Sequence, residues 1–269
     1  MLISVVVTTY NRPMALKRVL QALSKQTDSD FEVIVADDGS RDDTREMIEL
    51  LKPSLSFPLI HAWQEDKGFR LNASRNNGIK KSSGDYLIFL DGDCVPLPNF
   101  VSQHRLLAEK GFMVAGNRCL LRSALTRKIE NGEENVFLMN WTKALYYRFL
   151  GQINRIAPLI HLSVQASFRY KKQDRWQKLR GCNMAFWKED LLSVSGFDEF
   201  FQGWGFDDSE IAVRLINSGV KLKDGSFATG VLHLYHKEAV MKKEGPSWER
   251  LQELIKTKET KPKEGLISS

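Results

Sequence analysis

Two kinds of hydrophobic pattern alternate along the N-terminal part of the chain. Mostly apolar runs, typical of strands buried on both faces, occur at residues 2–7, 31–36 and 86–90, of which the last is continuous, and a weaker strand is expected at 59–63. Between them, apolar positions recur every three or four residues, as on one face of a helix. The first helical stretch follows Pro13, which suits a first turn, and its apolar positions are Leu16, Val19, Leu20 and Leu23. This alternation predicts an α/β fold with a Rossmann-like, mostly parallel sheet flanked by helices.

The pattern becomes weaker after Pro98. A helix over 100–110 and a short strand over 112–116 continue the alternation, whereas residues 122–180 are basic, aromatic and less periodic. Further strands are expected at 180–187 and 227–232, with a helix that opens at 203–210 and runs to about Ser218. From Lys256 the chain is rich in Lys and Glu, so we expect a frayed C-terminus. Because no repeat or linker interrupts the sequence, we expect one domain over residues 1–269.

Polar side chains follow three of the predicted strands. Tyr10 and Asn11 come after the first strand, Asp37 and Asp38 after the second, and Asp91-Gly92-Asp93 directly after the run 86–90. In an open α/β sheet, ligands bind outside the carboxyl ends of the strands, so these groups are expected in one crevice. Two carboxylates there could hold a divalent cation that also bridges substrate phosphates. The alternative is a set of turns, which is also how Asp28-Ser29-Asp30 is interpreted.

Two later segments add candidate chemistry. Asp207 and Asp208 precede a helical stretch, where the helix dipole favours acidic residues. Two adjacent carboxylates also repel each other, which raises the pKa of one of them towards the range of a useful base. Trp204 lies between two glycines, and an exposed indole suits the apolar face of a sugar. His233 and His236 are either ordinary histidines or metal ligands; with Asp93 they form a nitrogen and oxygen set that suits Mn²⁺ better than Ca²⁺.

Composition and charge narrow the range of partners. With 42% hydrophobic and 27% charged residues, the chain is globular rather than disordered. A net charge of +6 and a pI of about 9.1 favour anionic partners: nucleotides, phosphorylated glycans, phospholipid surfaces or nucleic acid. Arg70 and Arg75 are candidates for phosphate contact, or else belong to a solvated helix face.

Cysteine usage and hydropathy bear on the compartment. The three cysteines have no C-x-x-C spacing and predict free thiols in a reducing compartment. A strand begins almost at the first residue and no apolar stretch is long enough to cross a bilayer, so we expect no signal peptide and no membrane span. These features predict a cytoplasmic protein.

Taken in order, these segments resemble the motifs of a known enzyme family. Residues Thr8-Thr9-Tyr10-Asn11, Asp37-Asp38-Gly39-Ser40 and Asp91-Gly92-Asp93 resemble those of family-two glycosyltransferases with the GT-A fold. Residues 203–210 resemble the acceptor-side motif of β-1,4-galactosyltransferases and chondroitin-type polymerases, and residues 64–70 resemble a bacterial subgroup tied to surface polysaccharide assembly. The resemblance covers roughly residues 2–240, with four motifs in the family's order.

The resemblance implies a role for each matching residue. The uridine of a UDP-sugar would be bound by Thr8, Tyr10 and Asp38, and Arg75 would approach the uridine or diphosphate. Asp91 would face the ribose or the metal, with Gly92 and Asn183 also in the substrate site. Asp93 would bind Mn²⁺ or Mg²⁺ with His236; His233 occupies the place of a methionine ligand in galactosyltransferases. Trp204 and Asp207 would contact the sugars, and Asp208 would be the general base.

The family also implies a mechanism and an organisation of the chain. Asp208 would deprotonate an acceptor hydroxyl in one displacement that inverts the anomeric configuration. Residues 1–117 would form the nucleotide-binding half, 118–240 the acceptor-binding half, and 241–269 a C-terminal helix and tail. The family usually has Glu at the position of Asp207 and Gly at that of Phe206, so the donor sugar does not transfer from the resemblance.

The acceptor implied is a glycan or a lipid-linked sugar of lipopolysaccharide, capsule or a similar polymer. Peripheral contact of residues 122–180 with the inner face of the plasma membrane is an alternative to their being a solvated insertion. A nucleotidyltransferase should carry a Gly-rich basic loop where this chain has residues 8–12, and a nucleic-acid binder would not place acidic clusters at three strand ends. A protein that binds sugar nucleotides without transfer is the remaining alternative, against which Asp208 and His236 argue.

Overall fold

A computed structural model describes residues 1–135, 137, 139–203, 205–237 and 244–266. The main sheet of the described residues has seven strands in the order β3-β2-β1-β4-β8-β6-β9. Its strands are β1 (Ile3–Thr9), β2 (Phe31–Asp37), β3 (Leu59–Trp63), β4 (Tyr86–Asp91), β6 (Phe112–Ala115), β8 (Asn183–Trp187) and β9 (Lys221–Asp224). All neighbouring pairs are parallel except those of β8, which runs antiparallel to both β4 and β6. The predicted α/β class with a mostly parallel sheet is confirmed.

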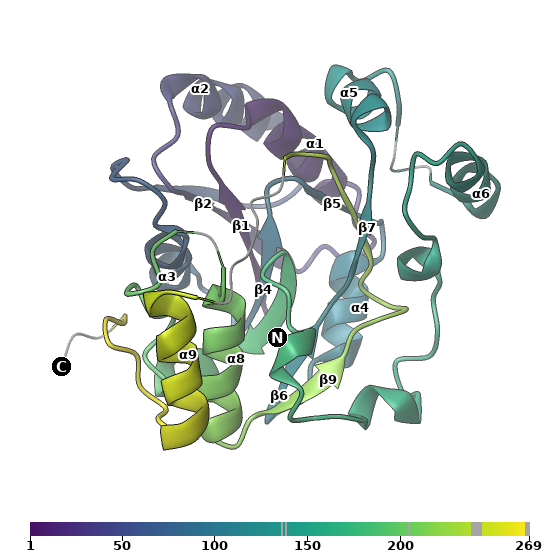
Figure 1. Ribbon diagram of the computed structural model, residues 1–269. Coiled ribbons are helices and arrows are strands. Elements are labelled where there is room, and N and C mark those ends of the chain that lie inside the picture. Colours follow the sequence, from purple (N-terminus) through teal and green to yellow (C-terminus); the bar gives the residue numbers. More distant parts are fainter. Residues whose placement is uncertain (136, 138, 204, 238–243, 267–269) are drawn as a thin grey trace.

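Helices cover both faces of this sheet. They are α1 (Pro13–Leu23), α2 (Asp42–Leu51), α3 (Leu71–Lys81), α4 (Phe100–Leu107), α5 (Ser123–Asn131), α6 (Trp141–Phe149), α7 (Lys188–Ser193), α8 (Asp207–Asn217) and α9 (Pro246–Thr257). Short 3₁₀ helices are η1 (Lys52–Ser54), η3 (Ala157–Leu159), η4 (Ser167–Tyr170) and η5 (Trp176–Lys178). Figure 1 shows α1 and α2 on the opposite side of the sheet from α3 and α8.

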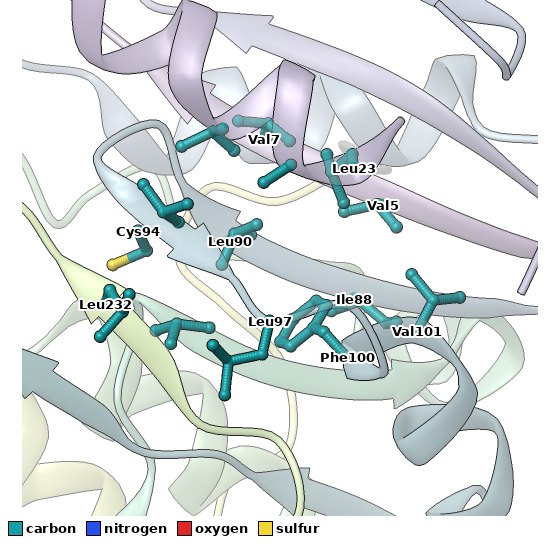
Figure 2. Packing of buried hydrophobic residues seen from close by; sticks show 14 of the residues in the cluster. Val5, Val7, Leu23, Ile88, Leu90, Cys94, Leu97, Phe100, Val101 and Leu232 are labelled. Atoms are coloured by element: carbon teal, nitrogen blue, oxygen red, sulfur yellow. The ribbon is translucent and has the colours of Figure 1, made fainter. Parts of the chain in front are cut away.

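The central strands are buried on both faces, as their mostly apolar runs predict. Val5 and Val7 belong to the hydrophobic cluster beneath α1, whereas Val6 between them belongs to the cluster beneath α3 and α8. Figure 2 shows the first cluster, in which side chains of β1 and β4 meet Leu23 of α1 and Leu232. This two-sided core fixes β1 and β4 rigidly, so the residues at their carboxyl ends are positioned by the sheet.

A second, small sheet was not predicted. It consists of β5 (Cys94–Pro96), β10 (Val231–His233) and β7 (Arg118–Leu120), with β10 in the middle. β10 pairs antiparallel with β5, so that His233 lies opposite Cys94, and parallel with β7. These strands are three residues long, too short for a periodicity signal. Their pairing brings the late histidine segment beside Asp93.

Several predicted boundaries are wrong. The helix that starts at Phe100 ends at Leu107, not at 110, and the strand expected over 180–187 begins only at Asn183. The strand expected over 227–232 is the short β10, because Phe227 has a φ of +59°, a left-handed conformation that cannot continue a strand.

The C-terminal tail is docked rather than frayed up to the last described residue. The buried carboxylate of Asp198 accepts hydrogen bonds from the N–H groups of Lys263 and Glu264, each at 3.0 Å. The N–H of Leu266 donates to the carbonyl oxygen of Ser195 at 2.8 Å, and its side chain packs against the core beneath α8. Hydrogen bonds between residues so far apart in the chain cannot be predicted from a segment that is merely rich in Lys and Glu.

His104 predicts a pH dependence of stability. It is fully buried, its Nε2 lies 3.2 Å from Oδ1 of Asn183, and burial lowers its pKa to about 3. An unfolded histidine titrates near 6.5, so below that pH the unfolded state takes up a proton that the folded state excludes. We expect the free energy of unfolding to fall by up to about 1.4 kcal/mol per pH unit from this group as the pH drops from 6.5 towards 3. Urea titrations at several pH values, compared with His104→Gln, measure the effect; equal slopes in both proteins would contradict it.

In the part of the chain that the structure describes, every helix is too short or too polar to cross a lipid bilayer. The location of the protein stays a prediction.

Candidate active site

The carboxyl ends of β1 and β4 meet at one edge of the main sheet. The strands pair in parallel with Thr8 opposite Asp91, and the Thr8 hydroxyl donates to Oδ1 of Asp91 at 3.0 Å. The N–H of Gly92 donates to the carbonyl oxygen of Thr8 at 2.7 Å, and a Cβ on Gly92 would lie 2.8 Å from that oxygen. The close approach of two backbones therefore requires glycine in the middle of Asp91-Gly92-Asp93.

A pocket of about 220 Å³ opens at this edge. It brings together side chains from three motifs that are far apart in the sequence. Its described lining consists of Thr8, Thr9, Tyr10, Arg12, Asp38, Phe69, Leu71, Asp91, Gly92, Asp93 and His236. The crevice expected from the strand-end rule is thus present, with both carboxylates of the 91–93 motif in its wall.

The two carboxylates after β2 have different environments. Asp38 lines the pocket, where its oxygens accept from the Gln64 amide and from the Arg70 N–H, both at 2.7 Å. Burial raises the pKa of Asp38, and these two hydrogen bonds oppose the rise. Asp37 is fully buried and accepts from the Ser40 N–H at 2.8 Å. The turn interpretation therefore applies to Asp37, whereas Asp38 remains available to a ligand.

The loop over residues 64–70 forms one wall of the pocket. The hydroxyl of Tyr10 donates to Oδ2 of Asp66 at 3.0 Å, which links this loop to the end of β1. Gly39 has a φ of +91°, and a Cβ there would lie 2.5 Å from Cα of Asp66, so the loop sits directly on the turn after β2. Nearly half of the Tyr10 side chain is exposed, which leaves its ring face accessible to a planar ligand.

Asp93 is surrounded by groups that carry or can carry positive charge. Nε2 of His233 lies 3.6 Å from its Oδ1, Nε2 of His236 lies 3.4 Å from its Oδ2, and Nη1 of Arg12 binds Oδ2 at 2.7 Å. His233 is buried and His236 is partly exposed to the pocket. Burial raises the pKa of the neighbouring Cys94 thiol, so that thiol stays protonated. One carboxylate and two imidazoles therefore remain as donors, and this set fits a divalent cation such as Mn²⁺.

Asp91, at the end of β4, is partly exposed, whereas Asp93 is buried. Burial and the negative charge of Asp93 raise the pKa of Asp91 to about 6, while the Arg75 guanidinium and the Thr8 hydroxyl oppose the rise. A positive ligand charge beside this pair would favour its ionised form. The electrostatics thus agree with a site built for a cation.

Arg75 does not line the pocket. Its side chain is 1% exposed and forms an ion pair with Asp207, and its guanidinium lies 5.2 Å from the centre of the Phe197 ring. Its charge lowers the pKa of both Asp91 and Asp208. The resemblance implies that Arg75 approaches the uridine or diphosphate, which stays a prediction. In the structure Arg75 is a buried cation whose charge acts on carboxylates of both halves of the site.

Asp208 lies in the first turn of α8. Its Oδ2 accepts from the N–H of Gly181 at 3.1 Å, and the side chain is half-buried. Burial and the charge of Asp207 raise the pKa of Asp208, against the opposing effects of Gly181 and Arg75. Phe206, at a φ of +67°, turns the chain into this helix. The helix-start interpretation is correct and compatible with a base, because the raised pKa is what a proton acceptor near neutral pH needs.

Two residues that were expected to contact the substrate are not found in the pocket lining that the structure describes. Asn183 is fully buried, and its amide donates to the carbonyl oxygens of Asn117 and Thr229 while Oδ1 faces His104. It holds β8 to neighbouring segments and does not line the pocket. Trp204 lies outside the described residues.

Sequence reasoning missed four residues of the pocket lining: Thr9, Arg12, Phe69 and Leu71. Thr9 and Phe69 lie within the recognised motifs 8–11 and 64–70, and Arg12 and Leu71 directly follow these motifs. Proximity to those motifs was the available signal. The contact between Arg12 and Asp93 depends on how the chain turns after β1, which sequence does not reveal.

Arg12 predicts a measurable effect on metal affinity. Its guanidinium bridges Asp93 and Glu130 of α5 at 2.7 and 3.0 Å and must leave Asp93 when a cation binds there. We expect Arg12→Gln to tighten Mn²⁺ binding by about 3- to 10-fold, because a competing charge is removed. Titration calorimetry measures the change. Arg18→Gln is the matched control, since Arg18 contacts only the backbone of Glu130 and the amide of Gln21 among the bonds described; weaker binding in Arg12→Gln would refute the competition.

Solved structures share the fold of the chain at low sequence identity. A crystal structure of S. aureus TarS residues 1–349 in complex with UDP-GlcNAc covers 96% of this chain and 66% of its own, with a TM-score of 0.66 and 15% identity. The mannosyltransferase PcManGT from Pyrobaculum calidifontis, in complex with GDP-Man and Mn²⁺, covers 87% of this chain and 57% of its own, with a TM-score of 0.56 and 19% identity. These likenesses concern the fold alone, and they confirm the predicted GT-A fold.

Sequence relatives are longer than this chain. A hyaluronan synthase from Pasteurella multocida is 31% identical over 88% of the chain and 24% of its own length. A chondroitin synthase from Escherichia coli is 30% identical over 88% of the chain and 34% of its own length. A validoxylamine A glucosyltransferase from Streptomyces hygroscopicus subsp. jinggangensis is 31% identical over 82% of the chain and 53% of its own length. The chain thus spans about a quarter to a half of the length of these curated relatives.

Two family models match the chain. The model described as the N-terminal domain of galactosyltransferase matches residues 161–237, which contain the segment that resembles the galactosyltransferase motif. The model of glycosyl transferase family 2 matches residues 4–180, more than half of the chain. The predicted enzyme class is thereby confirmed: the chain belongs to glycosyl transferase family 2.

Proposed function

We propose that this protein transfers a hexose or an N-acetylhexosamine from a UDP-sugar to a glycan or lipid-linked acceptor, with inversion and with a divalent cation, in the synthesis of a bacterial surface polysaccharide. One observation carries the proposal. A single sheet edge holds a pocket with an accessible aromatic face and carboxylates, and a half-buried carboxylate with a raised pKa stands at the start of α8. Arg75 forms an ion pair with Asp207, and its charge acts on both Asp91 of the pocket and Asp208, the proposed base. A base and a nucleotide pocket in one site suit a direct displacement.

The donor site is proposed to use residues 1–117 and the acceptor site residues 118–240. Tyr10 would stack on the uracil and Asp38 would accept from it, since both line the pocket. Thr8 orients the carboxylate of Asp91 towards the ribose or the cation. TarS in its complex with UDP-GlcNAc shows that this fold can hold a UDP-sugar.

Asp93 and His236 would hold Mn²⁺ or Mg²⁺, with His233 as a further ligand. A bound cation would supply charge neutralisation for the departing diphosphate. Asp208 would accept the proton of the acceptor hydroxyl, and Asp207, which forms an ion pair with Arg75, would hydrogen-bond the sugars.

The nature of the polymer is inferred from relatives. Two of them are named for the synthesis of hyaluronan and chondroitin. A third, from Campylobacter jejuni, is named as a glucosyltransferase acting on an undecaprenol-linked diphosphate glycan and is 30% identical over 44% of this chain. Both free and lipid-linked glycans are therefore candidate acceptors.

The test is release of UDP from a panel of UDP-sugars with Mn²⁺, with and without EDTA. We expect release from at least one donor, and its loss with EDTA. A protein that binds UDP-sugars without releasing UDP in the presence of any acceptor would be a binding protein, which is the alternative. The absence of both binding and release would refute the proposal.

Asp93→Asn tests the metal ligand separately. We expect Mn²⁺ affinity to fall by at least about 10-fold, since one charged donor of the set is lost. Asp30→Asn is the matched control, because Asp30 belongs to the similar Asp28-Ser29-Asp30 segment and is exposed. Calorimetric Mn²⁺ titration reports both variants; equal affinities would remove Asp93 from the ligand set.

A further inference from the structure

A second pocket lies beside the segment over residues 180–182, since Arg180 lines it. Its volume is about 550 Å³, larger than that of the pocket at Asp91. It lies between β7, the end of β6, η5 and the segment around Asn154 and Arg155. Its described lining consists of Ala115, Gly116, Asn117, Arg118, Leu120, Asn154, Arg155, Arg175, Gln177, Lys178, Arg180, Asp224 and Ser226. None of these residues belongs to the site described above.

The charge of this pocket is strongly positive. Among its described lining residues are five cationic side chains and a single carboxylate, Asp224. Lys178 forms an ion pair with Asp224, so the carboxylate is already neutralised. The lining also contains four arginines: Arg118, Arg155, Arg175 and Arg180. A concave cluster of guanidinium groups suits a carboxylate or phosphate, which arginine binds through two parallel hydrogen bonds.

Two of these arginines are held in place by the fold. The guanidinium of Arg155 donates from Nη2 to the carbonyl oxygen of Arg118 at 3.0 Å. Nη1 of Arg118 lies 3.2 Å from Sγ of the buried Cys182. Arg118 is partly buried, whereas Arg155, Arg175 and Arg180 are exposed. The contacts of Arg118 and Arg155 hold part of the cluster in place, whereas unrestrained long side chains on a solvated surface diverge into water.

The three-residue segment 180–182 contacts both this pocket and the active site. The N–H of Gly181 donates to Asp208 at 3.1 Å, and the N–H of Asp91 points to the carbonyl oxygen of Cys182 at 3.4 Å. Arg180, which directly precedes Gly181, lines the basic pocket. The proposed base therefore contacts the residue that follows Arg180, and Arg180 lines the basic pocket but not the donor pocket.

We propose that the basic pocket binds an oxyanion of the acceptor, a carboxylate or a phosphate carried within one or two sugar units of the attacking hydroxyl. The inference rests on the proposed function and names its acceptor class: an anionic glycan or a glycan phosphate rather than a neutral sugar. The donor diphosphate has its own place beside Asp93, so this second positive site serves a second anion. Asp93 already has three basic side chains as neighbours, Arg12, His233 and His236, so the arginines of the basic pocket are not needed to balance its charge.

Equilibrium binding to the full chain, saturated with UDP and Mn²⁺, tests the inference without turnover. Two pairs of probes separate the two sources of the anion. One pair is a chondroitin tetrasaccharide and its carboxyl-reduced, neutral form; the other is N-acetylglucosamine 1-phosphate and N-acetylglucosamine. The variant is Arg175→Gln, whose side chain is exposed and can be replaced without opening the core. Lys171→Gln is the matched control: it removes one charge from an exposed residue of the same insertion, outside the pocket lining.

We expect the anionic member of one pair to bind at least about 5-fold more tightly than its neutral counterpart, with the preference declining as salt is added. Arg175→Gln should reduce that preference by about 3-fold or more and leave UDP affinity unchanged, and Lys171→Gln should change neither. The pair that shows the preference identifies the anion as carboxylate or phosphate.

Any of four results would overturn the inference. Equal binding of anionic and neutral probes by a chain that binds UDP normally refutes it and leaves the proposed transfer intact. A preference that survives both Arg175→Gln and Arg180→Gln places the anion elsewhere. A loss of UDP affinity in Arg175→Gln would assign the pocket to the donor. If the unmodified chain binds no UDP at all, the proposed function fails and this inference fails with it.

Discussion

Asp208→Asn is expected to lower the rate of sugar transfer by about 10²- to 10⁴-fold and to leave UDP affinity within about twofold. The carboxylate is the only group at the start of α8, among the described residues, that combines a raised pKa with a position beside Gly181 and outside the donor pocket. An asparagine oxygen can still accept from the Gly181 N–H, so the local backbone should keep its conformation. What the amide cannot do is accept a proton, and the loss should therefore appear in turnover rather than in donor binding.

A matched control is available in the same molecule. Asp190 also lies in the first turn of a helix, α7, and its pKa is also raised by burial and by an adjacent acidic residue, Glu189. It does not line the donor pocket or the basic pocket. Asp190→Asn should retain full transfer. Steady-state kinetics and UDP titrations on both variants decide the matter: transfer that survives in Asp208→Asn removes Asp208 from the role of base.

The same carboxylate should set the acidic limb of the pH profile. A base must be ionised to act, and the pKa of Asp208 is raised by burial and by the charge of Asp207. Activity should therefore be low in acid and rise with pH through a midpoint above the ordinary aspartate value of about 3.9. This rising limb should be absent from the residual activity of Asp208→Asn. A limb unchanged in the variant would belong to another group.

The α/β core could be predicted because its signal is local. Strands β1, β2 and β4 are buried on both faces, and their sequences are mostly apolar. The helix after Pro13 has a single apolar face. The small sheet could not be predicted, because strands of three residues such as β5 and β7 have no period and are stabilised by pairing with β10, far away in the chain. The docked tail at Asp198 was missed for the same reason.

In the candidate site, too, some residues could be predicted from the sequence and others could not. Asp38, Asp91 and Asp93 were recognised because parallel strands deliver their carboxyl ends to one edge of a sheet. The residue pattern alone could not tell whether Asp37 or Asp38 faces the pocket, whereas the family resemblance selected Asp38. In the structure Asp37 is fully buried and Asp38 lines the pocket. Nor could the residue pattern tell that Arg75 is a buried partner of Asp207, since that contact joins residues 132 positions apart.

Arg75→Met is expected to destabilise the fold by about 3–5 kcal/mol. The guanidinium is 1% exposed and forms an ion pair with Asp207, which is itself only 15% exposed; without the arginine that carboxylate would remain in a poorly solvated place with no counter-charge. Methionine keeps most of the apolar volume beside Phe197, so the loss should be electrostatic in origin. The pKa values of Asp91 and Asp208 should both rise, because the Arg75 charge now lowers them.

Denaturant titrations measure this effect, and a double-mutant cycle assigns its cause. Arg75→Met combined with Asp207→Asn should be more stable than Arg75→Met alone, because the second change removes the uncompensated charge. Arg45→Met is the surface control: Arg45 is 55% exposed and lies 3.9 Å from Asp42, so its loss should cost no more than about 1 kcal/mol. If the double variant is as unstable as the sum of the single ones, the ion pair is not what holds Arg75 in place. The cost would then come from the packing of its side chain, and the electrostatic link between the base and the donor carboxylates would have to be abandoned.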